Sequence, residues 1–172
     1  SIVFMPLMGL AIATQILMGQ YVGRKQPDFG VKTTKTALKT GAFYVICITA
    51  AFYFFPHFFT GFFEGNVITE DMRLIQKQTI PLLHLLCIFT WGDLTYLCFG
   101  DAIRGAGDTN FHMKAMIFCG ILLVLGSWLI VGVFGGGIIA AWSWITTYAW
   151  LTGIIMGWRF FSGKWRNIDI TK

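Results

Sequence analysis

Long runs of apolar residues, separated by short polar segments, dominate the pattern along the chain. A helix needs about 20 mostly apolar residues to cross the hydrocarbon core of a bilayer. Five runs reach this length, at approximately residues 2–22, 38–59, 80–103, 111–134 and 138–161. Because lipid offers backbone groups no hydrogen-bond partners, such runs must be helices or the strands of a closed barrel. The alternation that barrel strands require is absent. The pattern therefore predicts an all-α integral membrane fold with five transmembrane helices in a single membrane domain, residues 1–172.

The composition agrees with a membrane class. Hydrophobic residues make up 56% of the 172-residue chain and charged residues only 12%, about half of the roughly 25% that soluble domains carry. The net charge of +5 could suggest a nucleic-acid partner. However, no basic stripe with interleaved surface aromatics and no nucleic-acid motif is present, so we expect none.

The distribution of basic residues explains the net charge. Eleven of the thirteen follow the first, third and fifth apolar runs: Arg24, Lys25, Lys32, Lys35, Lys39, Arg104, Lys114, Arg159, Lys164, Arg166 and Lys172. The other side has only Arg73 and Lys77, in a predicted loop that also holds Glu64, Glu70 and Asp71. By the positive-inside rule, the basic side is cytoplasmic. This predicts a multi-pass protein of the cytoplasmic (inner or plasma) membrane with its C-terminus in the cytoplasm.

The same orientation places Ser1 at the outer face, at the edge of the first apolar run. We therefore expect at least one further helix upstream and a longer parent protein, of which this chain is the C-terminal part.

One acid, Asp93, stands about midway along the third apolar run. A charged residue there costs roughly 2.5–3.5 kcal/mol on insertion scales, which favours a functional role. At helical spacing, one face carries Thr90, Asp93, Tyr96 and Gly100, so that a carboxylate, a hydroxyl and a phenol can project into one cavity. We expect Asp93 to hold a proton or a cation. The alternative is a structural carboxylate that hydrogen-bonds a neighbouring helix.

Other polar residues in the apolar runs have two interpretations each. Asp101 lies near the predicted cytoplasmic end, and it either pairs with Arg104 or Lys114 to close the helix end or lines the cavity. Gln15 and Gln20 lie in the first run and need partners in lipid. Hydrogen bonds between helices are their default explanation, with cavity lining as the alternative.

The third run ends in the sequence Arg-Gly-Ala-Gly-Asp-Thr, residues 104–109. Gly105 and Gly107 predict a tight cytoplasmic turn before Thr109. Arg104 can anchor to lipid head groups, and Asp108 can cap the helix that follows. The segment is similar to a fragment of a phosphate-binding loop, but no strand precedes it and no Lys follows its glycines. His112, at the start of the next helix, is expected at the membrane interface.

The chain offers no support for enzyme catalysis. It has no Ser/His/Asp arrangement and no G-x-S-x-G motif, and no cluster of His, Cys and acids has metal-ligand spacing. We expect neither an enzyme nor a cofactor. The tryptophans near the ends of the last helix and tail, Trp158 and Trp165 among them, fit the aromatic belt at a membrane interface.

Three segments together carry a resemblance to a known family. "MGLAIATQILMGQYVGRKQPD" at residues 8–28 resembles the helix and turn that multidrug and toxic compound extrusion (MATE) transporters have in each half. "FGDAIRGAGDTNFHMK" at residues 99–114 is similar to their other recurrent signature. "RFFSGKWRNI" at residues 159–168 is like their C-terminal ending. In order and spacing, the resemblance covers essentially the whole chain.

The resemblance implies a fold and an activity. Members of the family have twelve helices in two related six-helix bundles, and this chain would be the second bundle without its first helix. Its partners would be membrane lipid, the N-terminal bundle of the same parent chain and a small organic solute, often a drug-like cation. The solute leaves in exchange for Na⁺ or H⁺. The resemblance implies that Asp93 is the cation-coupling carboxylate, and a transient Na⁺ ligand if the coupling ion is Na⁺.

Two other functions compete with this antiporter. A flippase of the same superfamily, which moves lipid-linked oligosaccharides, should have a more cationic cavity, and no Lys or Arg lies in the middle of an apolar run. A membrane interaction subunit without transport activity has little need of an acid at the position of Asp93.

Overall fold

The computed structural model describes the backbone of residues 4–55 and 70–167, with side chains for 4–55 and 79–166. The long helices are α1 (Phe4–Gly23), α2 (Pro27–Phe54), α4 (Glu70–Gly105), α5 (Thr109–Ser127) and α6 (Ile138–Phe161). A π-helical segment, η1 (Trp128–Val133), continues α5, and a short 3₁₀ helix, η2 (Lys164–Asn167), follows α6. Over these ranges the chain forms no strand.

Five of these segments are long and apolar enough to cross a membrane: Phe4–Gly23, Pro27–Phe54, Thr79–Gly105, Thr109–Val133 and Ile138–Phe161. The prediction of an all-α fold with five membrane-spanning helices is therefore confirmed. The last segment coincides with the predicted run 138–161.

Two helices begin well before their apolar runs. The helix α2 starts at Pro27, eleven residues ahead of the predicted residue 38, and α4 starts at Glu70, ten residues ahead of residue 80. Pro is well suited to the first helical position because it needs no hydrogen bond there. Arg73 and Lys77, predicted to lie in a loop, therefore belong to the helix α4. Hydropathy finds the part of a helix that fits in lipid, whereas the helix itself extends further. Glu64 lies outside the described residues.

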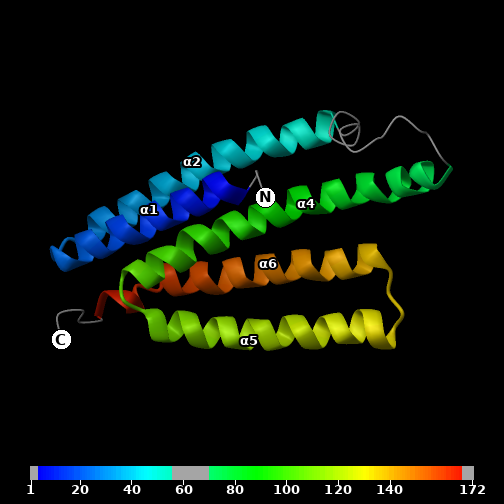
Figure 1. The fold of residues 1–172 in the computed structure, drawn as a ribbon. Helices are drawn as coiled ribbons and strands as arrows, with labels where there is room; N and C mark the ends of the chain where they lie inside the picture. Colours follow the sequence, from blue (N-terminus) through cyan, green and yellow to red (C-terminus); the bar gives the residue numbers. More distant parts are fainter. Residues whose placement is uncertain (1–3, 56–69, 168–172) are drawn as a thin grey trace.

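Figure 1 shows α4 in the middle of the bundle, with α1 and α2 on one side and α5 and α6 on the other. The α1–α2 turn, the α4–α5 turn and η2 all lie at the same end of the bundle (left in Figure 1). We call this end, where the basic turns and tail gather, the basic end. At the opposite end a short turn joins η1 to α6, and Gly135 adopts a φ of +62° there, a conformation that favours glycine.

Two apolar clusters hold the bundle together. The cluster at the basic end joins α1, α4, α6 and η2 through Met18, Phe99, Ala102, Ile103, Ala106, Met156, Phe160 and Trp165. The second cluster joins α1, α2 and α4 through Leu7, Ala37, Val45, Leu94 and Cys98. The α4 helix contributes to both clusters, which makes it the central element of the fold.

Small residues bring α4 close to its neighbours. A Cβ atom added to Gly92 of α4 would lie 2.9 Å from the backbone nitrogen of Trp150 in α6. At the basic end, a Cβ on Gly105 would overlap the backbone carbonyl of Gln15 in α1. Such approaches are the usual way in which membrane helices gain contact, because lipid provides no hydrophobic driving force between them.

Candidate functional site

Asp93 lies on the side of α4 opposite the fully buried residues that α4 contributes to the two apolar clusters. Its neighbours define the two packed faces, because Gly92 contacts α6 and Leu94 packs against α2. Successive residues of a helix are about 100° apart around its axis. Asp93 therefore points between these two contacts, on the side of α4 where Gly100 faces α5 two turns further on, and its side chain is half-buried.

The carboxylate of Asp93 makes no hydrogen bond and no ion pair with any residue whose side chain the structure describes. The structural alternative, a hydrogen bond to a neighbouring helix, thus has no partner in this part of the chain. No three His, Cys, Asp or Glu side chains in the described ranges gather as metal ligands. A single carboxylate of this kind can take up a proton or accept contacts from a small cation.

The face predicted around Asp93 is only partly assembled. Thr90 is buried, and its hydroxyl donates a 2.7 Å hydrogen bond to the carbonyl of Leu86 in its own helix. It therefore has no hydrogen left to donate to a bound solute. Tyr96 is half-buried, one turn from Asp93 towards the basic end. Gly100 lies beneath the Tyr96 ring, and a Cβ there would be 3.4 Å from it.

His112 of α5 covers the same face of α4 near the basic end. Its ring centroid is 6.3 Å from that of Tyr96, and a Cβ on Gly100 would lie 3.5 Å from its Nε2. That nitrogen is buried without a hydrogen-bond partner in the described structure. The prediction of an interfacial position for His112 does not anticipate this burial, because the sequence gives no sign that α5 packs on α4 at Gly100.

The pairing predicted for Asp101 is present. The Arg104 guanidinium donates to the Asp101 carboxylate at 2.9 Å, with the two side chains 44% and 11% exposed. The three-residue spacing places both on one side of α4. Asp101 thus closes the helix end as an ion pair. Arg104 is expected from the sequence to anchor to lipid head groups. In the structure its guanidinium pairs with Asp101 and remains partly exposed.

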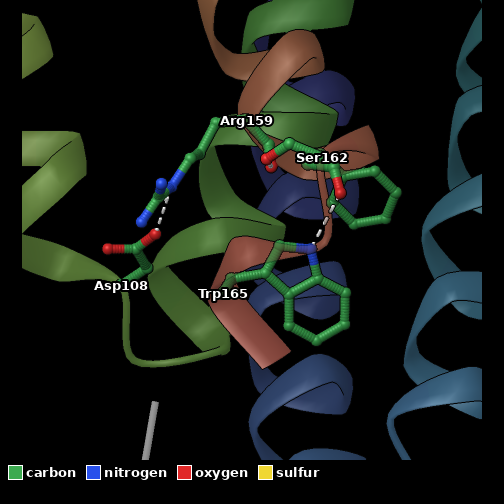
Figure 2. A network of polar contacts seen from close by, with 5 residues as sticks. Asp108, Arg159, Ser162 and Trp165 are labelled. Atoms are coloured by element: carbon green, nitrogen blue, oxygen red, sulfur yellow. Dashed lines mark hydrogen bonds and ion pairs between the residues drawn. The ribbon is translucent and has the colours of Figure 1, made fainter. Parts of the chain in front are cut away.

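The role predicted for Asp108 is wrong. It occupies the N-cap position of α5, but its side chain makes no capping hydrogen bond. Its carboxylate instead accepts a 2.7 Å hydrogen bond from Nε of Arg159, near the end of α6 (Figure 2). The two side chains are 5% and 17% exposed, and the guanidinium also lies 4.6 Å from the centroid of the Phe111 ring. In the pair with Arg159 both groups are charged, whereas a capping bond to a backbone N–H would involve only the charge of the carboxylate.

The remaining residues of the loop motif, residues 104–109, determine the shape of the turn between α4 and α5. Gly107 has a φ of +87°, which favours glycine. Gly105 is the last residue of α4, and the carbonyl of Gly105 would lie 3.2 Å from a Cβ on Gly19 of α1. Thr109 begins α5. The turn is thus fixed by backbone approach to α1 at one side and by the Asp108–Arg159 pair at the other.

The helices, the mid-helix acid and the Arg-Gly-Ala-Gly-Asp-Thr turn can now be set beside known proteins. A sequence model of the MatE family matches residues 1–129 of the 172-residue chain. The chain belongs to the MatE family. The matched range contains Asp93 and the whole loop motif, whereas Arg159 and the tail lie beyond it.

A curated relative points the same way. The chain is 28% identical over 119 residues to the "Probable multidrug resistance protein NorM" of Mannheimia succiniciproducens. This alignment covers 69% of the present chain but only 24% of the relative, so the chain spans about a quarter of the length of that protein. No solved structure matches the chain. The family and the apolar helices together make this a multi-pass membrane protein.

In this MatE chain, the two glutamines of α1 do not form the predicted contacts. Neither Gln15 nor Gln20 makes a side-chain hydrogen bond within the described structure. The predicted hydrogen bonds between helices are therefore not formed by these two side chains with the described residues, and the prediction stays open. Gln15 contributes its backbone to the contact with Gly105, and Gln20 is exposed.

The tail of this MatE chain is part of the packed structure. Figure 2 shows Trp165 next to the end of α6. Its indole is almost fully buried, donates a 2.8 Å hydrogen bond to the backbone carbonyl of Phe160 and stacks on the Phe160 ring. The next residue, Arg166, reaches the start of α2 and pairs with Asp28 at 2.9 Å. The aromatic-belt interpretation is thus wrong for Trp165. Its buried position depends on the turn after α6, which hydropathy does not reveal.

Proposed function

We propose that this MatE chain is part of the C-terminal bundle of a cation-coupled efflux antiporter, in which Na⁺ or H⁺ enters the cell as an organic solute leaves it. Membership of the MatE family supports a transport function. The name of the NorM relative, a probable multidrug resistance protein, supports organic solutes as cargo. The observation that carries the proposal is Asp93, a carboxylate midway along the apolar part of α4 that has no partner among the described side chains.

Three acids, Asp93 and Asp101 of the apolar part of α4 and Asp108 of the turn after it, have different surroundings. Asp101 and Asp108 each contact an arginine, so their charges are compensated in this structure. Asp93 has no such partner among the described residues. A charge at its depth is costly in lipid, and a bound proton or cation removes that cost. Ion binding at Asp93 therefore changes the free energy of any conformation in which this face of α4 is closed off from water.

Coupling follows from this dependence. If Asp93 is more exposed to water when the transporter is open to one side than to the other, ion occupancy shifts the population between the two states. A cationic solute favours the ionised carboxylate, so it competes with the coupling ion. Exchange results because the site is occupied by either one or the other. In the proposed orientation, the basic end lies in the cytoplasm.

Efflux from vesicles tests this function in the intact protein that contains this chain. The wild type and the Asp93→Asn variant are compared with a Na⁺ gradient or a pH gradient imposed separately. We expect one gradient to drive efflux of a cationic dye in the wild type and Asp93→Asn to lose at least tenfold in rate. Asp28→Asn, which removes an exposed acid at the start of α2, is the matched control and should transport normally.

Two results would contradict the proposal. Normal gradient-driven efflux by Asp93→Asn would show that the carboxylate is not the coupling site. Transport that responds to neither gradient would favour the flippase or a protein without transport activity, and a lipid-linked oligosaccharide flipping assay would separate these two.

A further inference from the structure

A groove between α1 and α2 lies apart from the acid site on α4. It encloses about 320 Å³ near the basic end. The α1 wall includes Leu10, Leu17 and Tyr21, and the α2 wall includes Phe29, Lys32 and Thr36. Apolar and polar side chains thus face one another across the groove, which is the arrangement that an amphiphile requires.

The polar wall offers one cation and several hydrogen-bond acceptors. Lys32 is exposed, and its ammonium lies 5.2 Å from the centroid of the Phe29 ring. The hydroxyls of Thr33 and Thr36 donate to the carbonyls one turn earlier in α2, each at 3.0 Å. Their hydrogens are therefore engaged and their oxygens can only accept. A matching ligand carries a negative charge for Lys32 and hydroxyl groups that donate to the threonine oxygens.

The surroundings of the groove are strongly basic. Four further cations lie along the α1–α2 turn and α2: Arg24, Lys25, Lys35 and Lys39. The one acid between residues 4 and 55 is Asp28, and its carboxylate is already paired with Arg166 of the tail at 2.9 Å. Arg166 of the tail thereby compensates the one acid of residues 4–55, so that it repels an anion less. Clusters of this kind at the end of a membrane helix recognise anionic lipid head groups.

The groove continues along both helices away from the basic end. The α2 lining extends from Phe29 to Thr40, about 16 Å along the helix axis. On α1, Ala13 and Leu17 are exposed to the groove. Lys32 is thus near the basic end of the groove, and Leu10 and Ala13 of α1 line the part farther from it.

We propose that this groove binds an anionic phospholipid whose head group bears hydroxyls, of the phosphatidylglycerol type. The phosphate contacts Lys32, the head-group hydroxyls donate to Thr33 and Thr36, and one acyl chain lies along Leu10 and Leu17. This lipid is a bound component of the bundle and is not the transported solute, since the groove belongs to α1 and α2 and the proposed coupling acid belongs to α4.

Native mass spectrometry of the intact protein in detergent tests the site with defined lipids. We expect retention of phosphatidylglycerol to exceed that of phosphatidic acid, which has the charge without the hydroxyls, and to exceed that of phosphatidylcholine by at least fivefold. Inorganic phosphate should not compete. Equal retention of all three lipids would overturn the proposal.

Two variants separate charge from shape. Lys32→Gln should lower phosphatidylglycerol retention about fivefold, the contribution expected of one lysine near an anionic head group. Lys35→Gln, an exposed lysine of the same helix that does not line the groove, is the matched control and should change retention less than twofold. Ala13→Phe, which fills the groove and leaves the charge unchanged, should lower retention as much as Lys32→Gln does.

Equal losses in Lys32→Gln and Lys35→Gln would mean that lipid is attracted diffusely and that the groove is not a site. Unchanged retention in Ala13→Phe would exclude an acyl chain in the groove. A third experiment tests whether another helix of the same protein, rather than a lipid, occupies the groove. If Ala13→Cys in delipidated protein resists a small maleimide, protein already covers the groove and the lipid proposal is wrong.

Discussion

Asp93 and Asp108 are both acids in an apolar chain, and they have opposite surroundings. Asp108 is 5% exposed and contacts the guanidinium of Arg159 at 2.7 Å. Asp93 is half-buried on α4 and has no charged or hydrogen-bonding partner among the described residues. The first arrangement fixes two parts of the chain to one another. The second leaves a carboxylate whose charge state can change without breaking any contact, and this is the property that a coupling site needs.

The largest loss of stability is expected when Asp108 loses its partner Arg159. Arg159→Leu leaves the buried Asp108 carboxylate unpaired and should destabilise the protein by about 3–5 kcal/mol, measured by thermal unfolding of the intact protein in mild detergent. The double variant Asp108→Leu/Arg159→Leu should recover most of this loss, because no buried charge then remains. If Arg159→Leu unfolds at the same temperature as the wild type, the pair does not hold α6 to the α4–α5 turn.

The stability of the protein should also depend on ions that bind Asp93, the acid without a described partner. Na⁺ or acid should stabilise the wild type by about 2.7 kcal/mol at a concentration one hundred times the dissociation constant. In Asp93→Asn this dependence should disappear, because the bound ion no longer neutralises a charge. Melting curves over a series of Na⁺ concentrations and pH values provide the measurement. An equal response in both proteins would place ion binding elsewhere.

A smaller effect is expected for the partly exposed pair at the end of α4. Arg104→Gln removes the 2.9 Å contact to Asp101 and should cost about 0.5–1 kcal/mol, because water screens a guanidinium that is 44% exposed. The same unfolding assay applies, and high salt should reduce the difference between variant and wild type. A loss as large as that of Arg159→Leu would mean that Asp101 is as dependent on its partner as Asp108 is.

The smallest loss of stability is expected for the exposed pair of Arg166 and Asp28. Arg166→Gln breaks the exposed pair with Asp28 and should cost about 0.5 kcal/mol or less. The tail should stay in place, because Trp165 keeps its buried position without Arg166. Tryptophan fluorescence reports on this directly, and a red shift in Arg166→Gln would show that the ion pair, rather than the indole, holds the tail.

Local patterns in the sequence predict the helices and the Asp101–Arg104 pair. Five apolar runs of membrane-spanning length identify the helices, and a three-residue spacing identifies the pair. The helices α2 and α4 begin ahead of the predicted apolar runs, because hydropathy does not register helical turns outside the apolar segment. Lys32 and Lys35 precede the predicted run 38–59, yet they belong to α2, which begins at Pro27.

Contacts between distant segments could not be predicted in this way. Asp108 and Arg159 are 51 residues apart, and nothing in either segment marks the other as its partner. The same holds for Trp165 in the basic-end cluster, for His112 over Gly100 and for the groove between α1 and α2. Each depends on how helices pack, and a periodic pattern gives the apolar face of a helix without naming its neighbour.

The close approach of α4 and α6 has a mechanical consequence. A Cβ on Gly153 of α6 would lie 3.0 Å from the carbonyl of Gly92 and would overlap the Thr95 side chain, and the Trp150 indole donates a 3.1 Å hydrogen bond to the carbonyl of Ile88. Two helices whose backbones approach this closely cannot slide or rotate past one another without a steric clash. Asp93 therefore belongs to a rigid pair of helices. Any displacement of α4 that follows ion binding must move α6 as well, along the whole of this contact.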